Sequence, residues 1–228
     1  MKNIAQRLAA IRESIRAAER RFGRPPGSVT LIAVSKSRSS EEVLAAADAG
    51  QRDFGENYVQ EALLKITQAA KPDLRWHFIG PVQSNKAKAI ARHFHWLHSL
   101  DRIKIATRLN DSRPDDLPPL NVCIQVNSSG EDSKSGVLPS ALPELAAALS
   151  GLPRLNLRGL MAMPEPVEDF AAQRRQFRAL RGCLEQLNGG GLALDTLSIG
   201  TTQDFEAAIA EGATLVRIGT GLFGPRTY

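Results

Sequence analysis

Cysteine is scarce in this sequence of 228 residues, which contains only Cys123 and Cys183. The two cysteines lie far apart and form no CxxC or Cys/His spacing, which argues against a disulfide framework and a zinc site. Cys123 lies in an apolar run and is predicted to be a small core residue. Two isolated cysteines without secretory features favour a reducing compartment, so we expect a cytoplasmic protein.

Motifs for several common chemistries are also missing. His93, His95 and His98 are close in the sequence, but they fall across a helix end and a strand, without a carboxylate or cysteine to complete a ligand set. There is no GxGxxG motif, no P-loop and no Ser/His/Asp arrangement. We therefore expect no metal site, no nucleotide-binding loop and no hydrolase triad.

Long apolar runs are absent. No stretch approaches the roughly 18 apolar residues of a membrane span, and the amphipathic N-terminal segment lacks a signal-peptide core. The 29 Lys and Arg residues against 24 Asp and Glu residues give a net charge of +5. These charges are scattered, and Arg174-Arg175 is the only adjacent basic pair in the middle of the chain. Because no aromatic-rich run accompanies this pair, we expect neither nucleic acid nor membrane as a partner.

The sequence does contain a regular alternation of apolar runs and amphipathic segments. An amphipathic helix is predicted over residues 2–22, where isoleucine and leucine recur at helical spacing. Strands are predicted over residues 29–34, 53–56, 75–80, 96–100, 122–127, 157–162, 196–200 and 214–219. Helices are predicted between them, over residues 39–49, up to about Ala70, then 84–93, 101–110, 139–149, 168–187 and 202–211.

This alternation predicts an α/β protein with a parallel sheet. Eight strands in a chain of this length favour a single (β/α)8 TIM barrel over residues 1–228, with an extra N-terminal helix. An open doubly wound sheet alternates in the same way and is the alternative.

Polar residues follow the predicted strands at the end where such barrels carry their chemistry. Lys36 follows the first strand and Asn57 the second, so we expect both at this rim. Partial burial lowers the pKa of a lysine, and a neutral amine can attack an aldehyde to form a Schiff base. The alternative is a structural lysine that extends from a strand end into solvent, which the spacing alone favours.

The last two predicted strands end in residues suited to phosphate. Ser198-Ile-Gly-Thr-Thr202 leads into a predicted helix start, where the glycine permits close backbone approach and the threonines offer hydroxyl groups. Gly219 and Thr220 follow the last strand. Ordinary helix capping by Thr201 or Thr202 is the alternative. In a closed barrel the first and last strands are neighbours, so a phosphate site here would lie near Lys36.

Two further features belong to the same rim. Arg217 is predicted to face inward from the last strand, where it could donate to a ring nitrogen, bind an anion or pair with a carboxylate. The polar loop 127–136 contains Glu131 and Lys134, which are candidate ligand contacts. For Glu131 and Lys134 the alternative is that they are solvated loop charges without a ligand.

A series of motifs extends over nearly the whole chain. They are Leu31-Ile-Ala-Val-Ser-Lys36, Phe54-Gly-Glu-Asn-Tyr-Val-Gln-Glu61, Trp76-His-Phe-Ile-Gly80 with Gln83-Ser-Asn-Lys86, Val126-Asn127 with Glu131, Lys134 and Gly136, Arg158-Gly-Leu-Met161, and Val216-Arg-Ile-Gly-Thr220 with Phe223-Gly224. In this order they resemble the motifs of the YggS/PROSC family, the pyridoxal phosphate homeostasis proteins.

The resemblance implies a barrel similar to the N-terminal domain of alanine racemase, with pyridoxal 5′-phosphate (PLP) bound as an aldimine, a Schiff base, on Lys36. It implies that Arg217 lies near the pyridine nitrogen. The implied phosphate contacts are Ser198, Gly200, Thr202, Gly219 and Thr220, and Asn57 completes the expected cofactor-binding residues. The family usually has Ser-Met-Gly-Met-Ser where this chain has Ser198-Ile-Gly-Thr-Thr202, which retains a hydroxyl at position 202.

The resemblance also implies a carrier that influences the supply of PLP, with apo forms of PLP-dependent enzymes as partners. The alternative is a PLP-dependent amino-acid racemase, which needs acid–base groups on both faces of the substrate carbon. In alanine racemase a second domain supplies one of them, whereas this chain stops at Tyr228, shortly after the last strand. An arginine beside the pyridine nitrogen also weakens the cofactor as an electron sink. We therefore expect no catalytic residues, and we expect a monomer.

Overall fold

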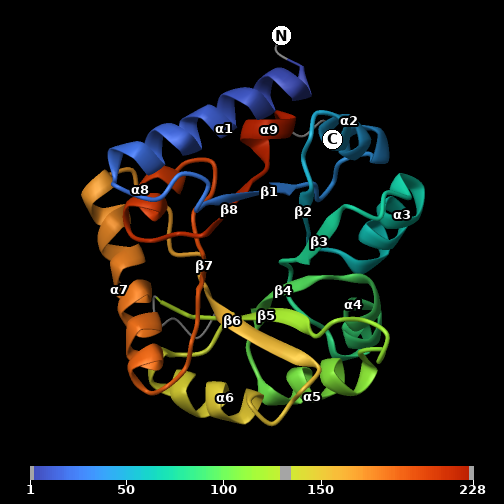
Figure 1. Ribbon diagram of the computed structural model, residues 1–228, viewed down its shortest axis with the longest axis vertical. Helices are drawn as coiled ribbons and strands as arrows, with labels where there is room; N and C mark the ends of the chain where they lie inside the picture. The colour runs from blue at the N-terminus through green and yellow to red at the C-terminus, as the bar shows by residue number, and fades with distance from the viewer. Residues whose placement is uncertain (1–2, 129–134, 226–228) are drawn as a thin grey trace.

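A computed structural model gives the fold and describes residues 3–128 and 135–225. Eight parallel strands form a closed barrel, in which the first strand pairs with both the second and the last (Figure 1). The strands are β1 (Thr30–Val34), β2 (Asp53–Glu56), β3 (Arg75–Phe78), β4 (Trp96–Leu100), β5 (Leu120–Gln125), β6 (Leu155–Met161), β7 (Thr196–Ser198) and β8 (Leu215–Ile218). The predicted (β/α)8 barrel is confirmed, and the open sheet is excluded.

Helices surround the barrel (Figure 1). The α-helices are α1 (Ile4–Arg21), α2 (Ser40–Asp48), α3 (Val59–Ala69), α4 (Ala87–His93), α5 (Ile103–Ser112), α6 (Leu142–Leu149), α7 (Phe170–Gly189), α8 (Phe205–Ala210) and α9 (Thr220–Phe223). Two 3-10 turns precede helices, η1 (Ser84–Lys86) before α4 and η2 (Pro139–Ala141) before α6. Within the described ranges, no helix is long and apolar enough to cross a membrane.

The predicted N-terminal helix completes the outer ring. In the described residues after β8, the helix is the four-residue α9, which is shorter than the other α-helices of the ring. The helix α1 lies against α8, α9 and α2 (Figure 1). Its buried face includes Leu8 and Ile15, and its first turn is closed by a capping box between Asn3 and Gln6.

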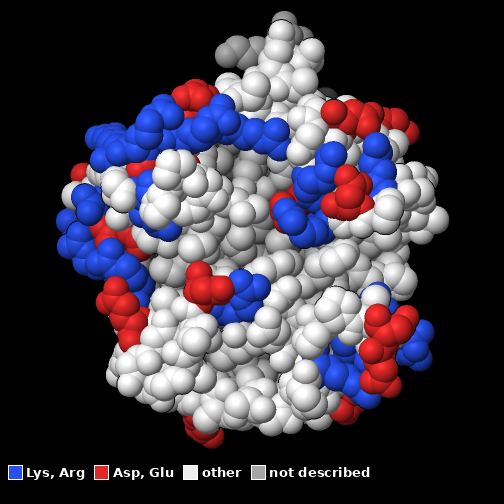
Figure 2. Space-filling view, in the orientation of Figure 1, with Lys and Arg blue, Asp and Glu red and all other residues white. Residues whose placement is uncertain are grey.

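Charged side chains are unevenly distributed on the face drawn in Figure 2. Lys and Arg side chains gather along α1, whereas the middle of this face is largely uncharged. Several α1 arginines are paired, because Arg16 and Arg20 both contact Glu13, and Arg21 contacts Glu206. Pairing of this kind reduces the net positive field of the helix surface.

The barrel interior contains polar side chains as well as apolar ones. His98 on β4 shares a hydrogen bond with Ser198 on β7, and both residues are fully buried. Because β5 and β6 separate these two strands around the barrel, the bond crosses the interior. Arg217 on β8 bonds to Ser198 and faces the same interior, as the sequence predicted.

Element boundaries differ from the sequence prediction near the end of the chain. The strand β7 ends at Ser198, and α8 begins only at Phe205. Gly200 has a φ of +91°, which side-chain-bearing residues rarely adopt, and this conformation turns the chain out of the strand. Asp204 is the N-cap of α8, and its carboxylate accepts bonds from the N–H and hydroxyl of Thr201 at 2.6 and 2.8 Å. The alternative that Thr201 or Thr202 caps α8 is therefore wrong, because the N-cap is Asp204.

Candidate functional site

A cavity of about 260 Å³ opens at the C-terminal ends of the strands. Its lining residues are Val34, Lys36, Asn57, Ile79, Met163, Thr201, Thr202, Gln203, Arg217, Gly219 and Thr220. Six of the eight residues predicted to bind the cofactor are among them. Of the other two, Gly200 lines an adjoining cavity of about 140 Å³ that also contacts Arg217. Ser198 lines neither cavity and lies beneath Arg217.

Lys36 lies in a turn that starts after β1 ends at Val34. The residue before it, Ser35, is fully buried and donates its hydroxyl to Oε1 of Glu56 at 2.5 Å. The residue after it, Ser37, has a left-handed φ of +58° and donates its N–H to Oε1 of Glu61 at 2.6 Å. Both neighbours are therefore held, and the partly buried side chain of Lys36 reaches the cavity from a fixed point.

A second lysine, missed by sequence reasoning, supports this turn from below. Nζ of Lys65 on α3 donates to the carbonyl of Ser35 at 2.6 Å and to Oε1 of Glu56 at 2.7 Å. It also pairs with Glu61, four positions earlier on the same helix. A Glu/Lys pair at this spacing is typical of a solvent-exposed helix surface, so the pattern does not indicate that Lys65 is only 3% exposed.

The loops after β7 and β8 meet at the cavity. A Cβ placed on Gly221 would lie 3.0 Å from Cγ2 of Thr202, so the two loops are in contact. The backbone N–H groups of Thr202 and Thr220 donate to no other group in the described part of the chain. Unpaired N–H groups beside threonine hydroxyls form a concave donor set of the kind that binds phosphate.

Arg217 is buried and lines both cavities. Its Nη1 donates to the carbonyl and hydroxyl of Ser198 at 2.5 and 2.7 Å, and its Nη2 donates to the carbonyl of Ala162 at 3.0 Å. Burial lowers the pKa of Arg217 to about 10, which still leaves the guanidinium charged at neutral pH. The three bonds use three of its five donors and leave two for a ligand.

Asn57 contributes an unsatisfied acceptor to the cavity. Its Oδ1 is buried and has no hydrogen-bond partner among the described residues. An unpaired buried acceptor costs about 1–3 kcal/mol, so a ligand that donates here would be stabilised. A Cβ at Gly80 would lie 2.3 Å from the carbonyl oxygen of Asn57, so only glycine lets the chain after β3 pass this residue.

Other predicted residues lie elsewhere. Glu131 and Lys134 fall outside the described residues. The three neighbouring histidines do not converge: His98 is buried in the barrel, His93 is exposed, and Nδ1 of His95 accepts the N–H of Trp76 at 3.0 Å. Within the described ranges, no group of three or more histidine, cysteine or acidic side chains is placed to hold a metal ion.

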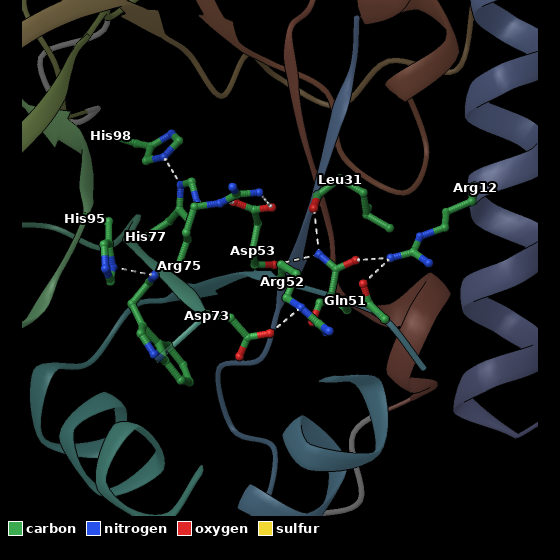
Figure 3. Close-up of polar contacts among 12 residues, drawn as sticks. Arg12, Leu31, Gln51, Arg52, Asp53, Asp73, Arg75, His77, His95 and His98 are labelled. Carbon is green, nitrogen blue, oxygen red and sulfur yellow. Dashed lines mark hydrogen bonds and ion pairs between the residues drawn. The ribbon is translucent and has the colours of Figure 1, made fainter. Parts of the chain in front are cut away.

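A larger cavity of about 430 Å³ lies at the opposite end of the barrel, beside α1. Its wall includes Arg12, which bonds to the carbonyl of Gly50 and the side chain of Gln51 (Figure 3). Its other arginines include Arg52 and Arg75, which pair with carboxylates. No lysine lines it, and barrels of this kind carry their chemistry at the other end. The 260 Å³ cavity is therefore the candidate functional site.

The family model and the relatives that match this chain point to the same family. The family model described as "Alanine racemase, N-terminal domain" matches residues 6–227. The pyridoxal phosphate homeostasis protein of Pseudomonas aeruginosa is 57% identical, and the alignment covers 100% of this chain and 98% of that protein. The protein of the same name from Escherichia coli K12 is 52% identical, with coverage of 100% and 99%.

The solved structure of PipY from Synechococcus elongatus, with PLP bound, has the same fold. It superposes with a TM-score of 0.85 at 37% identity, and the alignment covers 97% of this chain and 100% of PipY. Full-length similarity to named relatives, a matching family model and a shared closed barrel agree. The chain therefore belongs to the family of the alanine racemase N-terminal domain and, within it, to the pyridoxal phosphate homeostasis proteins.

Proposed function

We propose that this chain binds PLP in the 260 Å³ cavity and holds it covalently through Lys36, as a carrier of the cofactor. One observation carries the proposal: the amine of Lys36, the donor loops after β7 and β8, and Arg217 line a single cavity. The PLP bound to PipY and the names of the relatives from P. aeruginosa and E. coli support it.

The residues present fit PLP. When bound, PLP supplies an aldehyde, a phosphate and a pyridine ring. The amine of Lys36 would attack the aldehyde carbon, forming a C=N bond while the aldehyde oxygen leaves as water. The loop donors at Thr202, Gly219 and Thr220 would hold the phosphate, and Arg217 would donate to the ring nitrogen. The unpaired Oδ1 of Asn57 is a further polar group that the cavity offers a ligand.

The lining favours a carrier over an amino-acid racemase. Among the described lining residues, Lys36 and Arg217 are the only ionisable side chains. The pKa of Arg217 is about 10, so it stays charged near neutral pH and does not act as a base. Tyr58 is 59% exposed and does not line the cavity. A racemase needs a second acid–base group opposite the lysine, and the described lining offers none.

A Schiff base also suits reversible storage, because its hydrolysis returns the free amine and the free aldehyde. We therefore propose apo forms of PLP-dependent enzymes as the recipients of the cofactor. Both cysteines are unpaired, which supports a reducing compartment such as the cytoplasm.

Absorbance spectroscopy tests the proposal. The purified protein with PLP should show the absorbance band of a Schiff base between PLP and a lysine. Lys36→Ala should abolish this band, and Lys88→Ala, at an exposed position on α4, should retain it. No racemisation of common amino acids is expected. An unchanged spectrum in Lys36→Ala would overturn the covalent assignment, and sustained turnover of an identified amino acid would overturn the carrier assignment.

A further inference from the structure

Buried polar side chains form a continuous hydrogen-bonded chain across the barrel interior, and Figure 3 shows its part from His98 to Asp53. Nη1 of Arg217 lies 2.7 Å from Oγ of Ser198, which lies 2.7 Å from Nδ1 of His98. Nε2 of His98 lies 3.0 Å from Nδ1 of His77, and Nε2 of His77 lies 3.0 Å from Oδ1 of Asp53. No member is more than 6% exposed.

This hydrogen-bonded series of side chains connects the two ends of the barrel. Arg217 lines the candidate site at the C-terminal ends of the strands. Asp53 is the first residue of β2 and lines the 430 Å³ cavity at the N-terminal ends. Four different strands besides β2 contribute its other members, so closure of the barrel is what brings them into contact.

Asp53, at the end of this hydrogen-bonded series away from Arg217, determines which group donates and which accepts in every bond of the series. Burial raises the pKa of Asp53, but bonds from Arg75 and His77 outweigh burial and bring it to about 2. The ionised carboxylate only accepts, so Nε2 of His77 carries a hydrogen and its Nδ1 accepts from Nε2 of His98. Nδ1 of His98 then accepts the hydroxyl hydrogen of Ser198. The oxygen of that hydroxyl is left to accept from Arg217.

Both histidines are suited to this neutral arrangement. Burial lowers the pKa of His77, an effect that Asp53 opposes. Burial, followed by the nearby His77 and Arg217, lowers the pKa of His98 well below its ordinary value. A protonated His98 would carry a hydrogen on Nδ1 and could no longer accept the hydroxyl of Ser198. Neutral histidines therefore keep that hydroxyl pointed away from Arg217.

We propose that this series of hydrogen bonds from Asp53 to Ser198, which we call the relay, positions Arg217 at the candidate site. His98, His77 and Asp53 are its positioning residues, because they hold the Ser198 hydroxyl as an acceptor for Nη1 of Arg217. Without them the hydroxyl is free to rotate, and Nη1 keeps only the carbonyl of Ser198. The relay thus sets which donors of Arg217 remain for the ligand. The identity of that ligand as PLP rests on the proposed function.

The matched control lies on the same end of the barrel. Asp53 accepts from Nε and Nη2 of Arg75 at 2.7 and 2.6 Å, and Asp195 accepts from Nε and Nη2 of Arg158 at 3.0 and 2.6 Å. Both carboxylates therefore hold an arginine through two bonds, but only Asp53 also contacts a histidine of the relay. Asp195→Ala removes a two-bond arginine pair at a more exposed carboxylate and leaves the relay intact.

The first test reads the relay directly, without PLP. The chain has only 4 histidines, so ¹⁵N-labelled imidazole NMR can be assigned with single His→Gln variants. We expect both His77 and His98 to carry hydrogen on Nε2 and none on Nδ1 at neutral pH. Asp53→Ala should produce mixed tautomers at both rings, Asp53→Asn should preserve the pattern through its amide oxygen, and Asp195→Ala should change nothing.

The second test measures the effect on the site. Asp53→Ala should weaken PLP affinity roughly three- to tenfold, as expected for one lost hydrogen bond, whereas Asp53→Asn and Asp195→Ala should stay within about twofold. Wild-type histidines with hydrogen on Nδ1, or equal losses of affinity in Asp53→Ala and Asp195→Ala, would overturn the relay. If the wild type fails to bind PLP, the proposed function fails, and the NMR result still decides the relay.

Discussion

Nζ of Lys65 lies 2.7 Å from Oε1 of Glu56, beneath the turn that carries Lys36. Both side chains are buried, and Glu56 also accepts the hydroxyl of Ser35. The pair joins α3 and β2 to the end of β1, so it holds the turn that carries Lys36 from outside the cavity. The candidate site therefore depends on a buried ion pair that contacts no ligand.

Replacing Lys65 tests the importance of this pair. Lys65→Met should lower the free energy of unfolding by about 3–5 kcal/mol at neutral pH, because it leaves Glu56 buried without its cation. Burial raises the pKa of Glu56, so the folded state tolerates its protonated form and the loss should shrink as the pH falls. Urea unfolding at pH 7 and pH 5 measures both effects.

Lys71→Met is the control for this substitution. Lys71 pairs with Asp48 on the surface, where an ion pair contributes at most about 1 kcal/mol. Equal losses of stability in the two variants would show that the Lys65–Glu56 pair does not support the turn.

The hydroxyl of Thr202 should contribute to binding of the PLP phosphate and not to binding of the aldehyde. Thr202→Val removes a hydroxyl from the donor set of the two loops and should weaken PLP binding about five- to tenfold. Binding of pyridoxal, which lacks the phosphate, should be unchanged. Spectroscopic titration with both ligands measures the difference, and Thr107→Val, at an exposed hydroxyl that bonds within α5, is the control. Equal weakening for the two ligands would contradict a phosphate contact.

The interior histidines should make stability depend on pH. Burial lowers the pKa of both His77 and His98 below the ordinary 6.5. Just below pH 6.5 these histidines are therefore protonated in the unfolded chain but still neutral in the folded chain. Their contribution to stability is complete above about pH 6.5 and declines as the pH falls below that value. The urea midpoint should decrease from pH 7 to pH 5, and less steeply in His98→Gln. An identical pH dependence in that variant would exclude His98 as a cause.

Asp53 should stabilise the fold over a different pH window. Its pKa is about 2 against an ordinary 3.8, so its contribution is present above about pH 3.8 and is lost as the pH falls through 2. Asp53→Asn should therefore cost about 2 kcal/mol at pH 7 and almost nothing near pH 2. Unfolding free energies of both proteins across this range measure it. A difference that does not change with pH would contradict the depressed pKa.

The sequence predicted the barrel and most of the cavity because both follow from local patterns. Eight alternating units imply the parallel barrel, and residues at or just after the ends of its strands, such as Lys36, Asn57 and Arg217, must gather at one rim. The place of α1 in the ring did not follow from its amphipathic pattern, which shows that a face is buried but not against which partner.

The interior of the site was not predictable in the same way. The contact between His98 and Ser198 crosses the barrel and exists only once the sheet has closed. Ser198 was expected at the phosphate, and the structure instead shows its hydroxyl bonded to Arg217 and His98, so its contact with phosphate stays a prediction. Alternation along β4 provides one usable signal, because Trp96 and His98 share a face and interact through their rings.

Covalent trapping tests the central claim most directly. The protein is incubated with PLP, reduced with borohydride, digested and mapped by peptide mass spectrometry. The added mass of the reduced cofactor should appear on the peptide containing Lys36 and be lost in Lys36→Ala. Modification of another lysine, with the Lys36 peptide unmodified, would contradict the assignment of Lys36 as the residue that holds the cofactor.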